Sequence, residues 1–169
     1  PGMPANGEVK NSNGLVSLLP YVEQAALYDR FDHRLAYSVH NYRSSGTVVG
    51  DAATNPNFAL SETILAAFLC PSDNNGARDR CCGPESTYYG PGNNYKGSAT
   101  NYDFVVASFT DFGDQNGWKN AGTARRMFGQ NSETTPAMVI DGLSNTFAIG
   151  ETTKYHANGS GFAWAFRAW

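Results

Sequence analysis

Residues 136–151 constrain the fold of this chain more than any other stretch of its sequence. Two apolar runs, residues 138–140 and 147–149, flank a polar centre that contains Asp141-Gly142. Asp-Gly is typical of tight turns, because glycine tolerates a positive φ and the aspartate side chain bonds its own downstream backbone. The pattern therefore predicts a strand or short helix, then a turn, then a strand.

An apolar stripe at helical spacing predicts one main helix from Gly14 to about Asp32. Pro20 interrupts this stripe, so either the helix begins there with proline in its first turn or a longer helix is kinked. We expect the helix to anchor the core through four side chains: Leu19, Tyr21, Leu27 and Tyr28.

Shorter elements follow the helix. Residues 59–66 can form a helical turn with Asn57 or Ser61 as its cap, and residues 66–70 form a short buried strand that ends at Pro71. Strand-like segments recur at residues 102–107, 139–140, 146–149 and 162–166. The expected core residues of these segments are Phe68, Leu69, Ile140, Phe147 and Ile149. The predicted fold class is α+β, with one main helix packed on a small antiparallel sheet and long loops.

The composition excludes several classes of function. A chain of 169 residues suits a single domain over residues 1–169. Charged residues make up 16% of it, below the roughly 25% usual for soluble domains, and such weakly charged chains are commoner outside the cell. The net charge of −3 offers nucleic acid no basic face. No Gly-x-Ser-x-Gly, His-Glu-x-x-His or P-loop pattern occurs, so we expect no enzymatic activity.

The three cysteines lie close together in the sequence. A disulfide from Cys70 to Cys81 or Cys82 would close the intervening loop and stabilise the fold by about 3 kcal/mol through the unfolded state. Free buried thiols are the main alternative. A zinc site is less favoured, because adjacent Cys81-Cys82 lacks the usual Cys-x2-Cys spacing.

Four stretches of the chain together resemble a prepilin-like family of unknown function that is expanded in planctomycete-type bacteria. They are residues 18–28, Phe-Leu-Cys-Pro-Ser-Asp at 68–73, Asn-Tyr-Lys-Gly at 94–97, and Ile-Asp-Gly-Leu-Ser-Asn-Thr at 140–146 with Gly150-Glu151. Their order and spacing match the family over most of the chain. The resemblance implies a pilin-like globular head.

Full members of that family begin with a prepilin-type signal and a hydrophobic helix that leads into a Pro-Pro-Gly junction, and Pro1-Gly2 resembles the end of this junction. They often end with a His-x9-Asp-Gly motif, which none of His33, His40 and His156 forms with Asp141-Gly142. We therefore expect a fragment that lacks the N-terminal helix and the C-terminal end.

The resemblance implies a non-enzymatic structural subunit, related to pseudopilins of type II secretion, at the cell surface or in an extracellular filament. Its partners would be copies of itself or related pilin-like subunits, with membrane contact only through a helix absent from this sequence. The alternative is an extracellular module that binds a glycan or another solute through loop aromatics such as Tyr88, Tyr89 and Trp118.

No cofactor is expected, apart from a possible calcium ion. Some related pseudopilin heads hold calcium in a C-terminal loop, and Asp141, Asn145 and Glu151 offer oxygen ligands around the Asp-Gly turn. The competing interpretation is that Asp141 and Asn145 bond the turn backbone and that Glu151 pairs with a cation.

Overall fold

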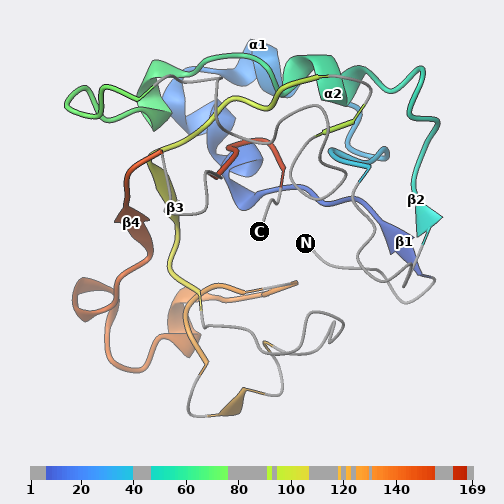
Figure 1. Ribbon diagram of the computed structural model, residues 1–169. Coiled ribbons are helices and arrows are strands. Elements are labelled where there is room, and N and C mark those ends of the chain that lie inside the picture. The colour runs from blue at the N-terminus through green and yellow to red at the C-terminus, as the bar shows by residue number, and fades with distance from the viewer. Residues whose placement is uncertain are drawn as a thin grey trace.

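The computed structural model describes residues 7–39, 47–75, 91–92, 95–106, 118, 121–122, 125–129, 131–154 and 162–166. In chain order the elements, with 3-10 helices labelled η, are β1 (Glu8–Val9), η1 (Gly14–Val22), α1 (Ala25–Tyr28), β2 (Thr47–Val48), α2 (Pro56–Leu60), η3 (Ala66–Phe68), β3 (Tyr102–Phe104), η5 (Pro136–Met138), η6 (Leu143–Asn145) and β4 (Ile149–Glu151). Short helices, two-stranded sheets and many loops make up the fold (Figure 1). The expected α+β class is confirmed. Within these residues, no helix has the length and apolar character needed to span a membrane.

The predicted main helix is divided into two shorter segments, η1 and α1. Asn13 caps η1, because its side-chain oxygen accepts the backbone N–H of Leu15 at 3.0 Å. Pro20 lies inside η1 and supplies no N–H. Glu23 then adopts the left-handed conformation, with φ of 61°, which ends η1 before α1 starts. The predicted main helix is therefore present as two segments, and the break lies at Glu23, whereas the prediction placed the start or the kink of the helix at Pro20.

Asn55, and not Asn57 or Ser61, caps α2. Its side-chain oxygen accepts the N–H of Asn57 at 2.9 Å, and Pro56 takes the first helical position. Helix α2 ends before Ser61, so the predicted turn over residues 59–66 was placed too late in the chain. The expected strand at residues 66–70 is also wrong, since residues 66–68 form η3.

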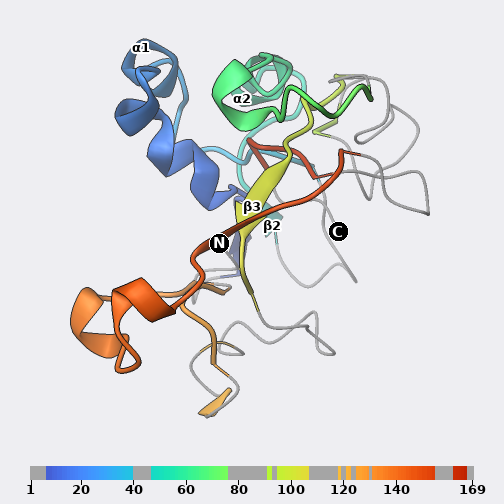
Figure 2. The ribbon, with the colours of Figure 1, turned by 90° about the vertical axis from the view of Figure 1, so that its left-hand side faces the viewer.

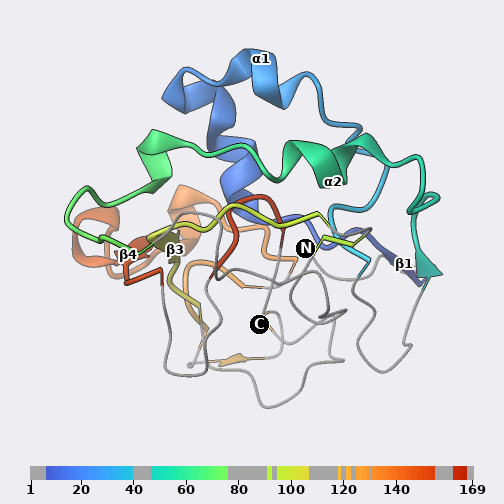
Figure 3. The same cartoon turned by 45° about the horizontal axis from the view of Figure 1, so that its top comes forward.

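Among the described residues, two separate sheets replace the single sheet that was predicted, and they lie on opposite sides of the molecule (Figure 3). Strands β1 and β2 are parallel, whereas β3 and β4 are antiparallel, with Phe104 opposite Ile149. Residues 162–166 form only isolated bridges, such as that of Ala163 with Ala99. Residues 163–166 are all buried, so this segment packs on every side and does not alternate as a strand with one covered face would.

Trp164 lies at the centre of the core. Its ring meets Phe31 edge-on with centroids 5.9 Å apart, and its indole N–H donates to the carbonyl of Thr63 at 2.9 Å. The buried cluster around it comprises Leu15, Val16, Leu19, Leu27, Phe31, Tyr37, Leu60, Leu65, Phe68, Ala99, Ala163, Ala165 and Phe166. Segments η1, α1 and α2 lie at the same end of the molecule, whereas residues 131–146 lie at the opposite end (Figures 1 and 2).

The predicted core was right for the N-terminal half except at Tyr21, and it was wrong for the segment after residue 135. Leu19, Leu27 and Phe68 are buried, Leu69 is half-buried, and Tyr28 packs against the cluster. By contrast, the exposed fraction is 84% for Tyr21, 91% for Ile140 and 84% for Phe147, and Ile149 is exposed as well. These side chains project away from the core, whose space is filled by residues 162–166.

Candidate functional site

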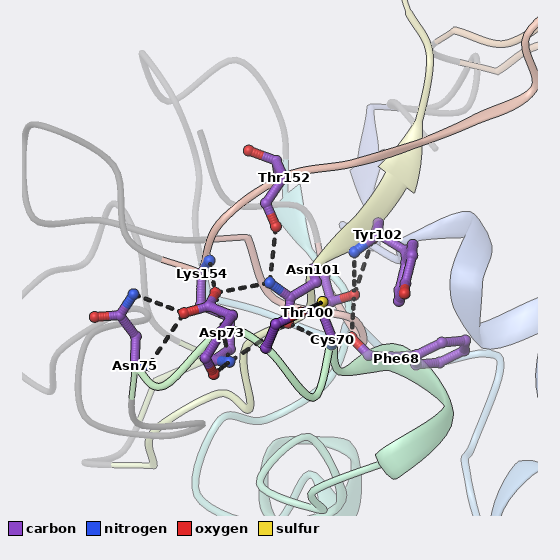
Figure 4. Close-up of polar contacts among 10 residues, drawn as sticks. Phe68, Cys70, Asp73, Asn75, Thr100, Asn101, Tyr102, Thr152 and Lys154 are labelled. Atoms are coloured by element: carbon purple, nitrogen blue, oxygen red, sulfur yellow. Dashed lines mark hydrogen bonds and ion pairs between the residues drawn. The ribbon is translucent and has the colours of Figure 1, made fainter.

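Three polar side chains meet beneath the surface where distant segments of the chain converge (Figure 4). Asp73 follows η3, Asn101 precedes β3, and Lys154 follows β4. The exposed fraction is 8% for the side chain of Asp73, 4% for that of Lys154, and 1% for Asn101. Charged groups are seldom buried this deeply unless they are paired. We refer to these three residues as the polar cluster.

Asn101 is held at both ends of its carboxamide. Its Oδ1 accepts the backbone N–H of Cys70 at 2.8 Å. Its Nδ2 donates to Asp73 Oδ2 and to the carbonyl of Thr152, each at 2.7 Å. Because Cys70 can only donate at this position and Thr152 can only accept, the two ends of the amide are distinguished by their partners.

Lys154 uses both its backbone and its side chain in the polar cluster. Its backbone N–H donates to Asp73 Oδ2 at 2.7 Å, and Nζ donates to the carbonyl of Asp73 at 2.8 Å. Nζ also lies 3.4 Å from Asp73 Oδ2 and 3.4 Å from Asn101 Oδ1. The ammonium group therefore has oxygen partners in place of water, as a buried cation requires.

Hydrogen bonds to the carboxylate hold the pKa of Asp73 well below its usual range. The largest contribution is the backbone N–H of Lys154, followed by the amide of Asn101 and the backbone N–H of Asn75. Asp73 is therefore ionised at neutral pH and forms an ion pair with Lys154.

Local sequence explains the position of Asp73. The stretch Pro71-Ser72-Asp73-Asn74-Asn75 predicts a turn, and Asp73 Oδ1 accepts the N–H of Asn75 at 3.0 Å. Backbone hydrogen bonds hold the other two segments close to Asp73. The N–H of Asn101 donates to the carbonyl of Phe68 at 2.9 Å, and the carbonyl of Asn101 accepts the N–H of Thr152 at 2.7 Å.

The polar cluster was not predicted from the sequence. Asp73 ends the stretch 68–73, Asn101 lies just after 94–97, and Lys154 lies three residues after Glu151. The only available signal was therefore that polar residues sit in or beside three of the four stretches that carry the family resemblance. No spacing rule connects positions that are 53 and 81 residues apart.

A second feature is the apolar arm, which we define as residues 136–149. Its large side chains Met138, Ile140, Leu143 and Phe147 are all exposed. Of the two predicted alternatives for the first apolar run, the short helix is the one present, because Pro136 opens the 3-10 helix η5; η6 follows the Asp-Gly turn. The predicted turn at Asp141-Gly142 is present, and Gly142 has a φ of 85°, the region that favours glycine.

Two of the residues predicted as calcium ligands, Asn145 and Glu151, have different surroundings in the structure. The amide of Asn145 donates to the carbonyl of Asp141 at 3.0 Å, so it bonds the turn. Glu151 lies on β4 opposite Tyr102, and burial followed by the charge of Glu151 raises the pKa of the Tyr102 phenol. No three acidic, histidine or cysteine side chains gather as a metal site in the part of the chain that the structure describes. Calcium binding stays a prediction.

Cys70 is half-buried at the edge of the polar cluster. Its Sγ lies 3.2 Å from Ser72 Oγ, and its backbone N–H donates to Asn101 Oδ1. Cys81 and Cys82 lie outside the described residues, so the disulfide stays a prediction. Of the loop aromatics, Trp118 is buried, and its indole N–H donates to Arg126 at 2.9 Å; Tyr88 and Tyr89 lie outside the described residues.

Comparison with known proteins assigns the chain to a family. The profile of the family described as "protein of unknown function (DUF1559)" matches residues 2–168. The chain therefore belongs to the DUF1559 family, also designated SBP_bac_10. No curated protein and no solved structure matches it significantly.

Proposed function

We propose that this chain is the outward-facing head of a non-enzymatic structural subunit, pilin-like or pseudopilin-like, that is exported and assembles with copies of itself or related subunits at the cell surface. The observation that carries the proposal is the apolar arm. Membrane attachment would come from the hydrophobic helix with which full members of the prepilin-like family begin. The resemblance of the four sequence stretches to prepilin-like proteins supports the same assignment.

The apolar arm has the properties of an interface. Ile140 and Phe147 are almost fully exposed, and Met138 and Leu143 lie between or beside them in the sequence. Covering one such side chain stabilises an assembly by about 1.5–3 kcal/mol. Apolar side chains gathered in one short segment are typical of protein contact surfaces, whereas scattered ones are not.

A second copy of the chain is the occupant that we propose for this arm. Strand β4 continues directly from it, and among the described residues β4 pairs with β3 alone. An open strand edge can pair with the same edge of a second copy about a twofold axis. In this antiparallel pair the β4 backbones would bond to each other, and the apolar arm of each copy would leave one end of the joined strands, where the other copy can cover it.

Sedimentation velocity over a concentration series tests this proposal. We expect the wild-type chain to self-associate and the double variant Ile140→Ser with Phe147→Ser to stay monomeric. The matched control is Tyr21→Ser, which removes an equally exposed ring from η1, at the other end of the molecule (Figure 2). This control should associate like the wild type.

Circular dichroism would establish that all three proteins are folded. A wild-type chain that stays monomeric up to about 100 μM would have no self-affinity useful for assembly and would contradict the proposal. Equal loss of association in the double variant and in Tyr21→Ser would contradict the assignment to the apolar arm.

A further inference from the structure

The polar cluster contains every group that amide exchange between two side chains needs. We infer that Lys154 and Asn101 form an intramolecular isopeptide bond, with Asp73 as the proton carrier. Nothing in this inference depends on self-assembly, and it concerns a different part of the molecule from the apolar arm.

The nucleophile lies beside the carboxamide that it would attack. Lys154 Nζ is 3.4 Å from Asn101 Oδ1, the oxygen bonded to the carbon at which the new bond would form. A nucleophile held next to its target group reacts far faster than the same groups free in solution. Both residues are at most 4% exposed, so water is kept from competing with the amine.

The carboxamide of Asn101 is polarised for attack. The backbone N–H of Cys70 donates to Oδ1 at 2.8 Å, at the oxygen on which negative charge develops when a nucleophile adds. A fixed N–H donor at this position stabilises a tetrahedral intermediate in the manner of an oxyanion hole. The carbonyl of Thr152 and the carboxylate of Asp73 fix the leaving nitrogen, Nδ2, each at 2.7 Å.

Asp73 contacts both nitrogen atoms that lose or gain a proton in the reaction. Its Oδ2 lies 3.4 Å from Lys154 Nζ and 2.7 Å from Asn101 Nδ2. It can therefore take a proton from the attacking amine and give it to the departing one, as a general base and then a general acid. Because the resting state is an ion pair, the first proton transfer is uphill, and we expect a slow, single maturation event after folding.

The reaction balances without any other reagent. Nζ of the ammonium passes a proton to Asp73, and its lone pair forms a bond to Cγ of Asn101. The bond from Cγ to Nδ2 then breaks, and Nδ2 leaves with the transferred proton as ammonia. A further proton released by the new amide nitrogen converts ammonia to ammonium, so the total charge is unchanged. No atom is oxidised or reduced.

The product would join β3 and β4 covalently at one end. Asn101 immediately precedes β3 and Lys154 follows β4, and the two residues are 53 positions apart. A link between them closes this long loop in the unfolded state as well as in the folded one, as a disulfide of the same span would. Unlike a disulfide, it resists reducing agents.

Intact-mass spectrometry of the purified full chain, with its thiols reduced, tests the inference. We expect the mass to fall short of the sequence mass by one ammonia. Trypsin should then release a branched peptide that joins the segment beginning at Gly97 to the segment beginning at Met127, with no cleavage after Lys154. Lys154→Arg should have the full mass of its sequence. Lys96→Arg, which alters an exposed lysine, should keep the deficit.

Two results would overturn the inference. One is a folded wild-type chain that keeps its full mass after prolonged incubation. The other is a deficit that persists in Lys154→Arg, because an asparagine that cyclises onto its own backbone also loses ammonia. The wild-type measurement requires no substitution, so the test stands even where a variant does not fold.

Discussion

The carboxamide of Asn57 provides the most direct test of how the loops of this protein are held together. Asn57 is fully buried at the start of α2. Its Oδ1 accepts the backbone N–H of Asp32 at 2.9 Å, and its Nδ2 donates to the carbonyls of Asp32 at 2.9 Å and Ala36 at 3.2 Å. The side chain of Asn57 thus supplies hydrogen-bond partners to the backbone of the loop from Asp32 to Ala36, which lies more than twenty positions earlier in the sequence.

Asn57→Ala should destabilise the fold by about 2–3 kcal/mol. The carbonyl of Ala36 would keep the amide of Asn55 at 2.7 Å, and that of Asp32 would keep the N–H of Leu35 at 3.0 Å. The N–H of Asp32 would lose its acceptor, which costs about 1–2 kcal/mol for a half-buried donor. The lost van der Waals contacts of a buried carboxamide add about 1 kcal/mol.

Urea denaturation followed by tryptophan fluorescence measures this change. A loss of about 2–3 kcal/mol moves the midpoint to lower urea by roughly 1 M or more for a domain of this size. Asn74→Ala, the same substitution at an exposed position, should stay within about 0.5 kcal/mol of the wild type. Equal stability of Asn57→Ala and Asn74→Ala would refute the reasoning that a side chain supplies the partners of this loop.

Two further predictions concern an acid group and a buried glycine. The hydrogen bonds from Arg34 lower the pKa of Asp32 to about 2, so the stability that this carboxylate contributes is complete above its unfolded pKa of about 4 and is lost as the pH falls through about 2. Between about pH 5 and 2, the free energy of unfolding of Asp32→Asn should therefore fall less steeply with decreasing pH than that of the wild type. Parallel curves for the two proteins would contradict this. A Cβ at Gly97 would clash with Cε1 of the buried Phe166 ring, so Gly97→Ala should lower the unfolding free energy by about 1–3 kcal/mol. An unchanged thermal midpoint for Gly97→Ala would show that the ring can move aside.

Much of the local structure could be predicted from neighbouring residues. The turn at Asp141-Gly142 and the turn that contains Asp73 both follow from short-range bonding of aspartate and the freedom of glycine. Pro20 was expected to start or kink the helix, but it lies inside η1, and the chain leaves the helix at Glu23. Asn55 before Pro56 is a favourable capping pair, but the apolar pattern by itself places this helical turn several residues too late in the chain.

The choice of core residues could not be made in the same way. Ile140 and Phe147 are as apolar as Leu19 and Phe68, yet the first two are exposed and the last two are buried. The difference depends on which distant segment fills the space beside the helices, and residues 162–166 fill it. An apolar pattern indicates that a side chain can be buried, but it does not indicate whether the core of the same chain or another molecule covers that side chain.

The order of residues along the chain is enough to predict the turns, the mixed class of the fold and the family to which the chain belongs. The meeting of Asp73, Asn101 and Lys154 and the exposure of the apolar arm are apparent only in the folded chain. The physical reason is one of range. Turn and cap preferences come from atoms a few residues apart, whereas burial and ion pairing depend on contacts between segments that only the completed fold brings together.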